Sequence, residues 1–110
     1  YAPRLKKEDG KLDFDHPASF LARLVRAYNP WPGAFHFFEG KRLKVFKAHP
    51  AEDLRTFPGR RYVVDGKPAW GTFDGLLILD QVQLAGKNKV SGEEFLRGAK
   101  EWIEEEENQG

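Results

Sequence analysis

The chain has 110 residues, of which 40% are hydrophobic, and this size and apolar content suit one small folded domain. It contains no cysteine, which excludes disulfides and thiolate metal sites. The sequence has no apolar run of about 18 residues and no apolar N-terminal segment, so we expect a cytoplasmic protein without membrane contact.

The formal net charge of +1 hides an uneven distribution of charge along the chain. Residues 23–89 contain twelve Lys or Arg against six Asp or Glu, whereas residues 101–107 contain five Glu and no basic residue. A basic central region favours a phosphate-bearing polymer as partner, because Lys and Arg release counterions condensed on the phosphates. The alternative interpretation is an ordinary solubilising surface.

The first predicted element is a helix over residues 17–28. Pro17 suits the first helical position, and Asp15 or His16 can supply the N-terminal cap. The apolar residues recur at helical spacing and predict one buried face: Phe20, Leu21, Leu24, Val25 and Tyr28.

A proline-rich corner, Asn-Pro-Trp-Pro-Gly at residues 29–33, follows the helix. Pro30 and Pro32 fix the backbone on both sides of Trp31 and remove two backbone donors, so the chain must turn here. From residue chemistry alone we predict a structural corner in which the indole of Trp31 is buried.

Turn-forming dipeptides divide the middle of the chain into short β-rich runs. They stand at residues 39–40, 58–59, 65–66 and 74–75. Strands are predicted at residues 34–38, 42–48, 61–64, 67–72 and 76–84, with an irregular crossing at 50–58. Several short antiparallel strands favour a barrel, because closure removes exposed sheet edges, although this pattern leaves a sandwich open.

A second helix is predicted at the C-terminal end of the chain. Ser91 and Glu94 match the Ser-x-x-Glu capping pattern. The apolar residues that follow predict a buried face: Phe95, Leu96, Ala99, Trp102 and Ile103.

The strand at residues 42–48 carries the main candidate for nucleic-acid binding. Alternation places Leu43 and Val45 on one face, and it places Arg42, Lys44 and Phe46 on the other. Cations beside an aromatic ring suit a nucleic acid, because phosphates meet the cations and bases stack on the ring. The competing interpretation is a solvated barrel exterior with a half-covered Phe46.

A second candidate is the loop after the last predicted strand. Lys87, Asn88 and Lys89, together with backbone donors and the following helix N-terminus, are predicted to form an anion site. The loop is not a nucleotide-binding P-loop, because Gln81 and Asn88 replace two required residues of that motif. Arg60, Arg61 and Lys67, near two hairpin turns, could extend the basic surface or serve only solubility.

No catalytic or metal site is predicted. His16, His36 and His49 lack the spacing of paired metal ligands, and nothing arranges a nucleophile beside a base. Asp65 and Asp74 precede glycines and are interpreted as turn formers.

The order of these motifs resembles the C-terminal domain of methionyl-tRNA formyltransferases. The matching parts are the helix, the corner at residues 29–33, the basic-aromatic run at 42–48, the segment at 82–88 and the capped helix at 91–98. The resemblance implies a mainly β fold: a small open Greek-key, OB-like β-barrel of five to six strands with flanking N- and C-terminal α-helices. It also implies a linker from a catalytic domain at residues 1–14, the barrel domain at 15–107 and a tail at 108–110.

The function implied by the resemblance is to bind initiator methionyl-tRNA and position its acceptor arm. Formyl transfer from 10-formyltetrahydrofolate would occur in an N-terminal catalytic domain in cis, and this domain would hold no cofactor. We expect a monomer. The implied nucleic-acid-binding residues are Arg42, Lys44, Phe46, Lys47, Lys87, Asn88 and Lys89, and the resemblance is weakest around Arg60, Arg61 and Lys67. The alternatives are an accessory domain of a sugar-nucleotide formyltransferase and a structural or interaction module without RNA binding.

Overall fold

The computed structural model describes residues 6–53 and 56–102, and it is mainly β with flanking helices, as predicted. Short hairpin-forming runs in the middle of the sequence form the strands, and the two amphipathic runs form the α-helices. In chain order the elements are η1 (Lys7–Gly10), α1 (Ala18–Tyr28), β1 (Ala34–Phe38), β2 (Lys41–Ala51), β3 (Arg61–Val64), β4 (Lys67–Gly71), β5 (Leu76–Leu84), β6 (Lys89–Ser91) and α2 (Gly92–Gly98).

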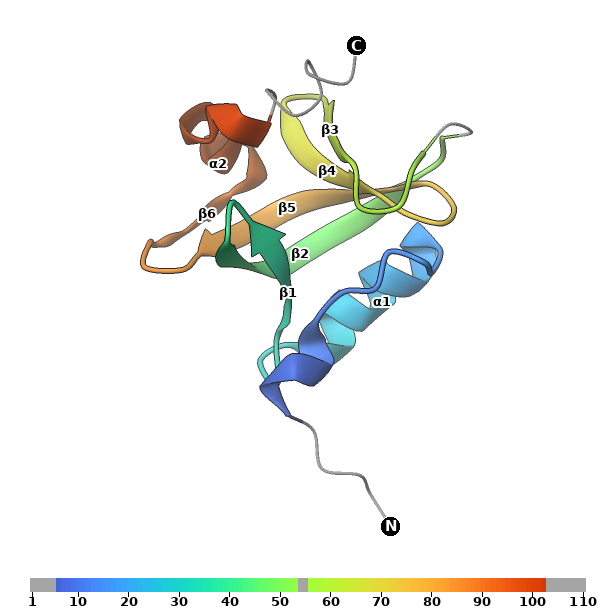
Figure 1. The fold of residues 1–110 in the computed structure, drawn as a ribbon, viewed down its shortest axis with the longest axis horizontal. Helices are drawn as coiled ribbons and strands as arrows, with labels where there is room; N and C mark the ends of the chain where they lie inside the picture. Colours follow the sequence, from blue (N-terminus) through green and yellow to red (C-terminus); the bar gives the residue numbers. More distant parts are fainter. Residues whose placement is uncertain (1–5, 54–55, 103–110) are drawn as a thin grey trace.

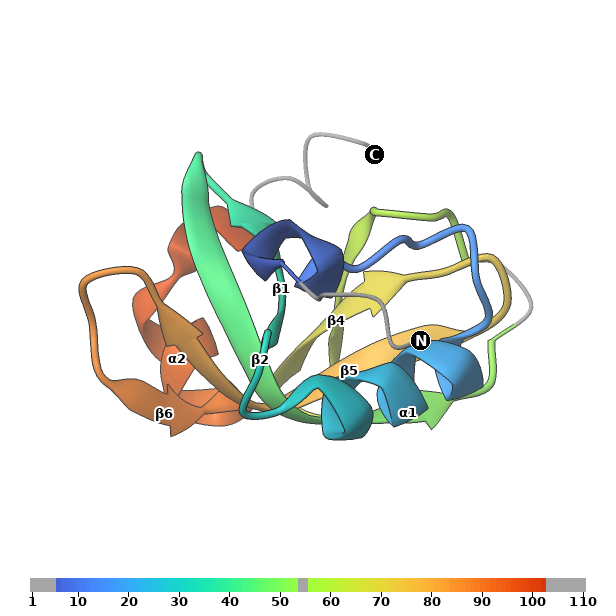
Figure 2. The ribbon, with the colours of Figure 1, turned by 90° about the horizontal axis from the view of Figure 1, so that it is seen from below.

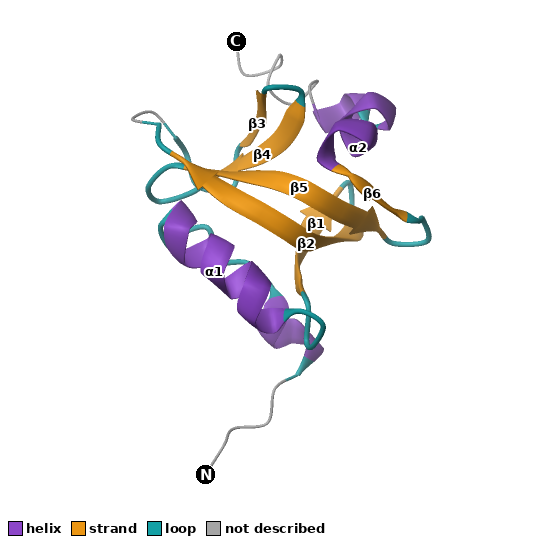
Figure 3. Ribbon diagram, turned by 180° about the vertical axis from the view of Figure 1, so that it is seen from behind, coloured by secondary structure: helices purple, strands orange, loops and turns teal. Residues whose placement is uncertain are grey.

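Within the described residues, six antiparallel strands form one curled, open sheet in the order β1-β2-β5-β4-β3, with β6 also paired to β5. Strand β5 is central because β2 pairs along one of its edges. On its other edge, residues 76–78 pair with β4 and residues 81–83 pair with β6. Figures 1 and 3 show α1 and α2 on opposite sides of the β2–β5 pair. The small barrel-like fold is therefore confirmed.

Two hairpins have the tight turns that their sequences predict. Glu39 and Gly40 join β1 to β2, and Asp65 and Gly66 join β3 to β4. All four residues have positive φ, between 51° and 79°. Two consecutive residues with positive φ make the turn that follows the natural twist of paired strands, and Gly and Asp favour that conformation.

The hydrophobic core lies between the sheet and the two helices. Its largest fully buried side chains include Trp70 and Trp102, and the Trp102 indole Nε1 donates to the Tyr62 carbonyl at 2.8 Å. On α1, Leu21 and Val25 are completely buried, as predicted, but Phe20 is 38% exposed. The prediction for Phe20 is wrong because it lies in the first turn of α1, where its ring contacts His16 instead of the core.

The start of α1 also differs from the prediction. Pro17 is the N-cap residue and not the first helical residue, and no side chain caps the helix. The Ala18 backbone N–H instead donates to the Asp74 carbonyl, 2.9 Å away in the turn before β5. Asp15 and His16 therefore do not cap α1, because a loop distant in sequence already accepts from the helix N-terminus.

The corner at residues 29–33 is held by its asparagine, not by its tryptophan. Trp31 is 55% exposed, so the prediction of a buried indole is wrong. The side-chain Nδ2 of Asn29 donates to the carbonyl of Val25 at 2.6 Å and reaches the carbonyls of Val45 at 3.2 Å and Phe46 at 3.4 Å. Asn29 thus ties the end of α1 to β2, and the indole is left at the surface.

Two other parts of the chain differ from the prediction. Strand β2 continues through Ala51, so the irregular crossing starts later than residue 50. Residues 89–91, predicted as loop and cap, form the short strand β6. Ser91 caps α2 as predicted, because its Oγ accepts from the Glu94 N–H at 3.1 Å, and α2 ends at Gly98, with residues 100–102 helical again. Ile103 lies outside the described residues.

Candidate nucleic-acid interface

The register of the sheet brings two separately predicted lysines onto one face. Lys44 of β2 lies opposite Gln83 of β5, and Gln83 lies opposite Lys89 of β6. Residues directly opposite each other in paired strands project from the same face of a sheet. Lys44 and Lys89 are both exposed. Lys89, which belongs to the loop candidate, therefore lies on the same surface as Lys44 of the strand candidate.

A β-bulge adds a third lysine to this surface. The pairing of β2 with β5 shifts between Val45 and Lys47, so that Lys47 lies opposite Gln81. Gln81 and Gln83 are two residues apart on β5 and therefore share a face. Without the bulge, strict alternation would turn Lys47 toward the core with Val45. We call Arg42, Lys44, Lys47 and Lys89 the basic face.

Two cations of the basic face lie over aromatic rings. The Cζ of Arg42 is 3.8 Å from the ring centroid of Phe35, and the Nζ of Lys89 is 4.4 Å from that of Phe46. Both distances fall within the range of cation–π contacts. The half-buried ring of Phe46, predicted to stack with bases, is thus partly covered by Lys89. A nucleic acid approaching here meets ammonium and guanidinium groups before it meets the ring.

The charges of the basic face have no acidic partner among the described residues. None of its four residues forms an ion pair with another residue in the described part of the chain. Arg42 and Lys44 line a hollow of about 210 Å³ beside the β5–β6 hairpin. Lys44, Lys47 and Lys89 are exposed and Arg42 is half-buried. Cations at the surface without an acidic partner remain available to phosphate oxygens.

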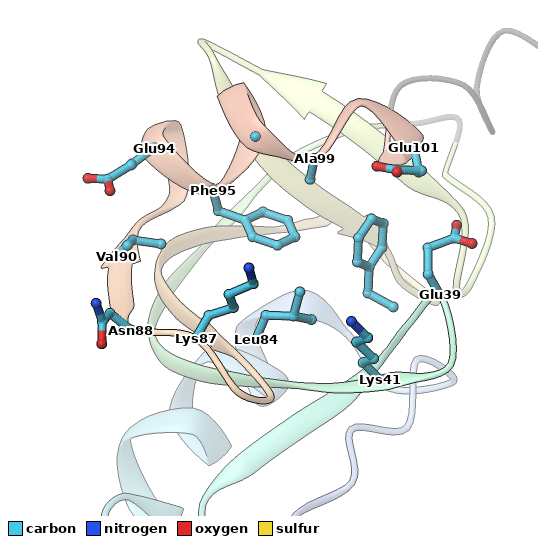
Figure 4. Close-up of a pocket in the computed structure, with 12 residues that line it drawn as sticks. Glu39, Lys41, Leu84, Lys87, Asn88, Val90, Glu94, Phe95, Ala99 and Glu101 are labelled. Atoms are coloured by element: carbon cyan, nitrogen blue, oxygen red, sulfur yellow. The ribbon is translucent and has the colours of Figure 1, made fainter.

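A larger hollow of about 450 Å³ lies on the other side of the same hairpin. Leu84 lines both hollows. Figure 4 shows Lys87 extending into the larger hollow toward Phe95, and Lys41 at its edge on the side of Glu39. In Figure 2 the β5–β6 hairpin and α2 lie toward one end of the molecule, away from α1.

The β5–β6 loop does not combine its backbone donors with the helix N-terminus in the way predicted for an anion site. The Lys87 backbone N–H donates to the Leu84 carbonyl at 2.9 Å, so this donor is already used. Strand β6 separates Lys87 and Asn88 from the N-terminus of α2, so that the hairpin tip and the helix do not form one cradle. Lys87 and Asn88 instead line the larger hollow.

The three additional bases do not join the basic face. Lys67 lies on β4, and its Nζ is 2.8 Å from Asp80 Oδ1; this hydrogen bond raises the pKa of Lys67. Arg61 lies on β3, 3.2 Å from a Glu39 carboxylate oxygen, with its Cζ 5.1 Å from the Phe38 ring centroid.

Arg60 is also occupied by structural contacts. Its guanidinium carbon lies 5.7 Å and 5.9 Å from the ring centroids of Phe57 and Tyr62. The three bases thus have partners on the β3–β4 side of the fold, and their binding to RNA stays a prediction.

A cluster that the sequence did not predict surrounds Asp80. Its carboxylate contacts Lys67 through one oxygen and His49 Nδ1 through the other, at 2.8 and 2.7 Å. Burial raises the pKa of Asp80, but the hydrogen bonds from Lys67 and His49 outweigh burial and leave that pKa below its usual value. No local sequence signal reveals this cluster, because His49 and Asp80 are 31 residues apart.

The remaining histidine of the sheet, His36, is half-buried beside the core. The His36 ring lies 4.6 Å from that of Phe14 and 5.5 Å from that of Trp70, and burial lowers its pKa. Among the described residues, no group of three His, Cys, Asp or Glu is placed to hold a metal ion. In the same part of the chain, no helix has the length and apolar character needed to span a membrane.

Comparison with known protein families assigns the domain. The family described as formyl transferase, C-terminal domain, matches residues 4–100. The chain belongs to this family. The resemblance carried by the proline-rich corner, the basic-aromatic strand and the capped helix is therefore confirmed.

The similar curated proteins include several bacterial methionyl-tRNA formyltransferases. The chain is 41% identical over 104 residues to the enzyme of Natranaerobius thermophilus, covering 89% of the chain and 33% of the enzyme. It is 42% identical over 101 residues to that of Granulibacter bethesdensis, covering 91% of the chain and 31% of the enzyme. The chain thus spans about a third of the length of these relatives.

Solved structures of HypX from Aquifex aeolicus share the fold. The structure in complex with tetrahydrofolic acid has a TM-score of 0.70 at 24% identity, over 93% of this chain and 18% of HypX. A variant structure, A392F-I419F, has a TM-score of 0.67 at 27% identity, over 88% of this chain and 19% of HypX. This formyl transferase C-terminal fold therefore occurs within larger proteins of different names.

Proposed function

We propose that this chain is the tRNA-binding C-terminal domain of a methionyl-tRNA formyltransferase. It holds the acceptor arm of initiator methionyl-tRNA while an N-terminal catalytic domain in cis transfers a formyl group from 10-formyltetrahydrofolate. The observation that carries this proposal is the basic face, in which Arg42, Lys44, Lys47 and Lys89 are gathered by sheet register and left without acidic partners among the described residues. The names of the similar curated enzymes agree with it.

The physical role of the domain is attachment and positioning. Each Lys or Arg that meets a phosphate releases condensed counterions, which gives affinity that depends on salt and not on sequence. A rigid sheet suits an A-form RNA helix, because that helix is recognised chiefly by shape and backbone. Holding the aminoacyl end beside a separate active site turns an encounter of two molecules into a step within one complex.

A salt titration tests the proposal. The domain is titrated with initiator tRNA at several salt concentrations, and log Kd is plotted against log salt concentration. We expect a slope equivalent to about three or more phosphate contacts, reduced by roughly one unit in Lys44→Ala. Lys67→Ala is the matched control and should leave the slope unchanged, because Lys67 is bound to Asp80.

The absence of saturable tRNA binding at low salt would contradict the proposal. Equal effects of Lys44→Ala and Lys67→Ala would contradict the assignment of the basic face.

The second candidate function is an accessory domain in an enzyme that transfers formyl groups to a small substrate such as a sugar nucleotide. This second function is supported by the occurrence of the same fold in HypX, a protein with a different name that was solved in complex with tetrahydrofolic acid. If this second function is correct, charge reversal at Lys44 in the full-length enzyme would leave the turnover of the sugar nucleotide unchanged.

A further inference from the structure

The larger hollow beside the β5–β6 hairpin has the construction of a binding site for a flat, partly apolar group. Its volume of about 450 Å³ lies within the range of small-molecule pockets. The apolar residues that line it come from β1, β5, β6 and α2 with its C-cap: Phe38, Leu84, Val90, Phe95 and Ala99. Lys87 extends into it, and Lys41 lies at its edge on the side of Glu39 (Figure 4).

The charges around the hollow favour an anionic ligand on the side next to the hairpin. Of the three carboxylates that line it, Glu39 is paired with Arg61 at 3.2 Å. Figure 4 shows Glu94 directed away from the hollow and Glu101 on the side opposite Lys87. Lys41 and Lys87 form no ion pair with a described residue. On the side next to the β5–β6 hairpin, the charge that faces the hollow is therefore that of Lys87.

We propose that this hollow receives an unpaired base of an RNA whose backbone lies on the basic face. The inference rests on the proposed function and adds to it a preference for unpaired nucleotides. Leu84 lines both hollows, so a strand that crosses the hairpin passes from Arg42 and Lys44 directly to this site. The base contacts the apolar residues, and Lys41 and Lys87 neutralise the flanking phosphates. Bases released from a helix are the ones that proteins can enclose in this way.

Gly98 allows the hollow to be filled without a change of charge. It lies on α2 and lines the hollow, and a Cβ added at Gly98 meets no atom within 4 Å. A Leu side chain at Gly98 therefore has free space at the edge of the hollow, and we expect it to narrow the space proposed for the base. Gly98→Ala is the matched control, because a single methyl group leaves most of the volume free.

The test compares two RNAs, a blunt duplex and the same duplex with a short single-stranded extension carrying 2-aminopurine. In the unchanged protein the extension should tighten Kd about tenfold, as expected for one enclosed base, and alter the 2-aminopurine fluorescence. Gly98→Leu should abolish both effects while leaving the Kd for the blunt duplex unchanged, and Gly98→Ala should keep both. Lys44→Ala should weaken binding of the two RNAs equally.

Equal affinity of the unchanged protein for the two RNAs would overturn the inference and leave the proposed function standing. Retention of the tenfold difference in Gly98→Leu would also overturn it, because the base would then lie elsewhere. Failure of both RNAs and initiator tRNA to bind at low salt would overturn the inference and the proposed function together.

Discussion

The substitution Asn29→Ala tests whether one side chain holds the proline-rich corner. The Asn29 amide has two N–H donors. One reaches the Val25 carbonyl at 2.6 Å, and the other is available to the carbonyls of Val45 and Phe46 at 3.2 and 3.4 Å. Each hydrogen bond contributes about 1 kcal/mol net, and acceptors left without a partner in a partly buried place add to the loss. We expect the free energy of unfolding to fall by about 2–3 kcal/mol.

Urea unfolding followed by tryptophan fluorescence measures this loss, and a thermal melt should show a decrease in Tm of about 10–20 °C. Asn88→Ala is the matched control, because Asn88 is an exposed asparagine in the β5–β6 hairpin; its effect should stay within about 0.5 kcal/mol. An Asn29→Ala protein as stable as the control would show that the three contacts of Asn29 do not stabilise the corner.

Two further predictions concern the Asp80 cluster and the tryptophans. Asp80→Asn should lower Tm at pH 7. The pKa of Asp80 is lower in the folded protein than its value of about 3.9 in the unfolded chain, so the ionised carboxylate stabilises the fold above that pH. This stabilisation is lost as the pH falls through the pKa of the folded protein. Melts from pH 7 to 2 should show the difference from the unchanged protein closing below about pH 4; a constant difference would contradict this linkage. Trp70→Ala, at a 2% exposed site, should cost about 3–5 kcal/mol. Trp31→Ala, at a 55% exposed site, should cost less than about 1 kcal/mol in the same urea assay, and equal losses would refute the assignment of Trp31 to the surface.

Strand alternation predicted some side-chain positions of the candidate site and could not predict others. Alternation correctly placed Leu43 and Val45 in the core and Arg42 and Lys44 outside, because successive side chains of a strand point to opposite faces. It could not place Lys47, since its outward position depends on a bulge in the pairing of β2 with β5. It also could not distinguish Lys44 from Lys67, because the partner of Lys67 is a carboxylate on another strand.

Contacts between distant segments also explain why the predictions for Trp31 and for residues 89–91 were wrong. Trp31 has a large aromatic side chain of the kind usually buried in a core. The contacts of Asn29 with α1 and β2 hold the corner instead and leave the indole exposed. Strand β6 has only three residues, too few for a periodic pattern, and it forms because β5 presents an unpaired edge beyond β4.

The sequence by itself determined the features that depend on neighbouring residues: the two tight hairpins, the amphipathic helices, the cap at Ser91 and the family. These features follow from backbone conformational preferences and short-range spacing, which act within a few residues. The tertiary structure alone decided which cations lack an acidic partner among the described residues, how Lys89 and Lys44 share a face, and how Lys41 and Lys87 come to line one hollow. Those arrangements depend on strand register and on contacts between distant segments, and register is set by the packing of the whole sheet and not by any local pattern.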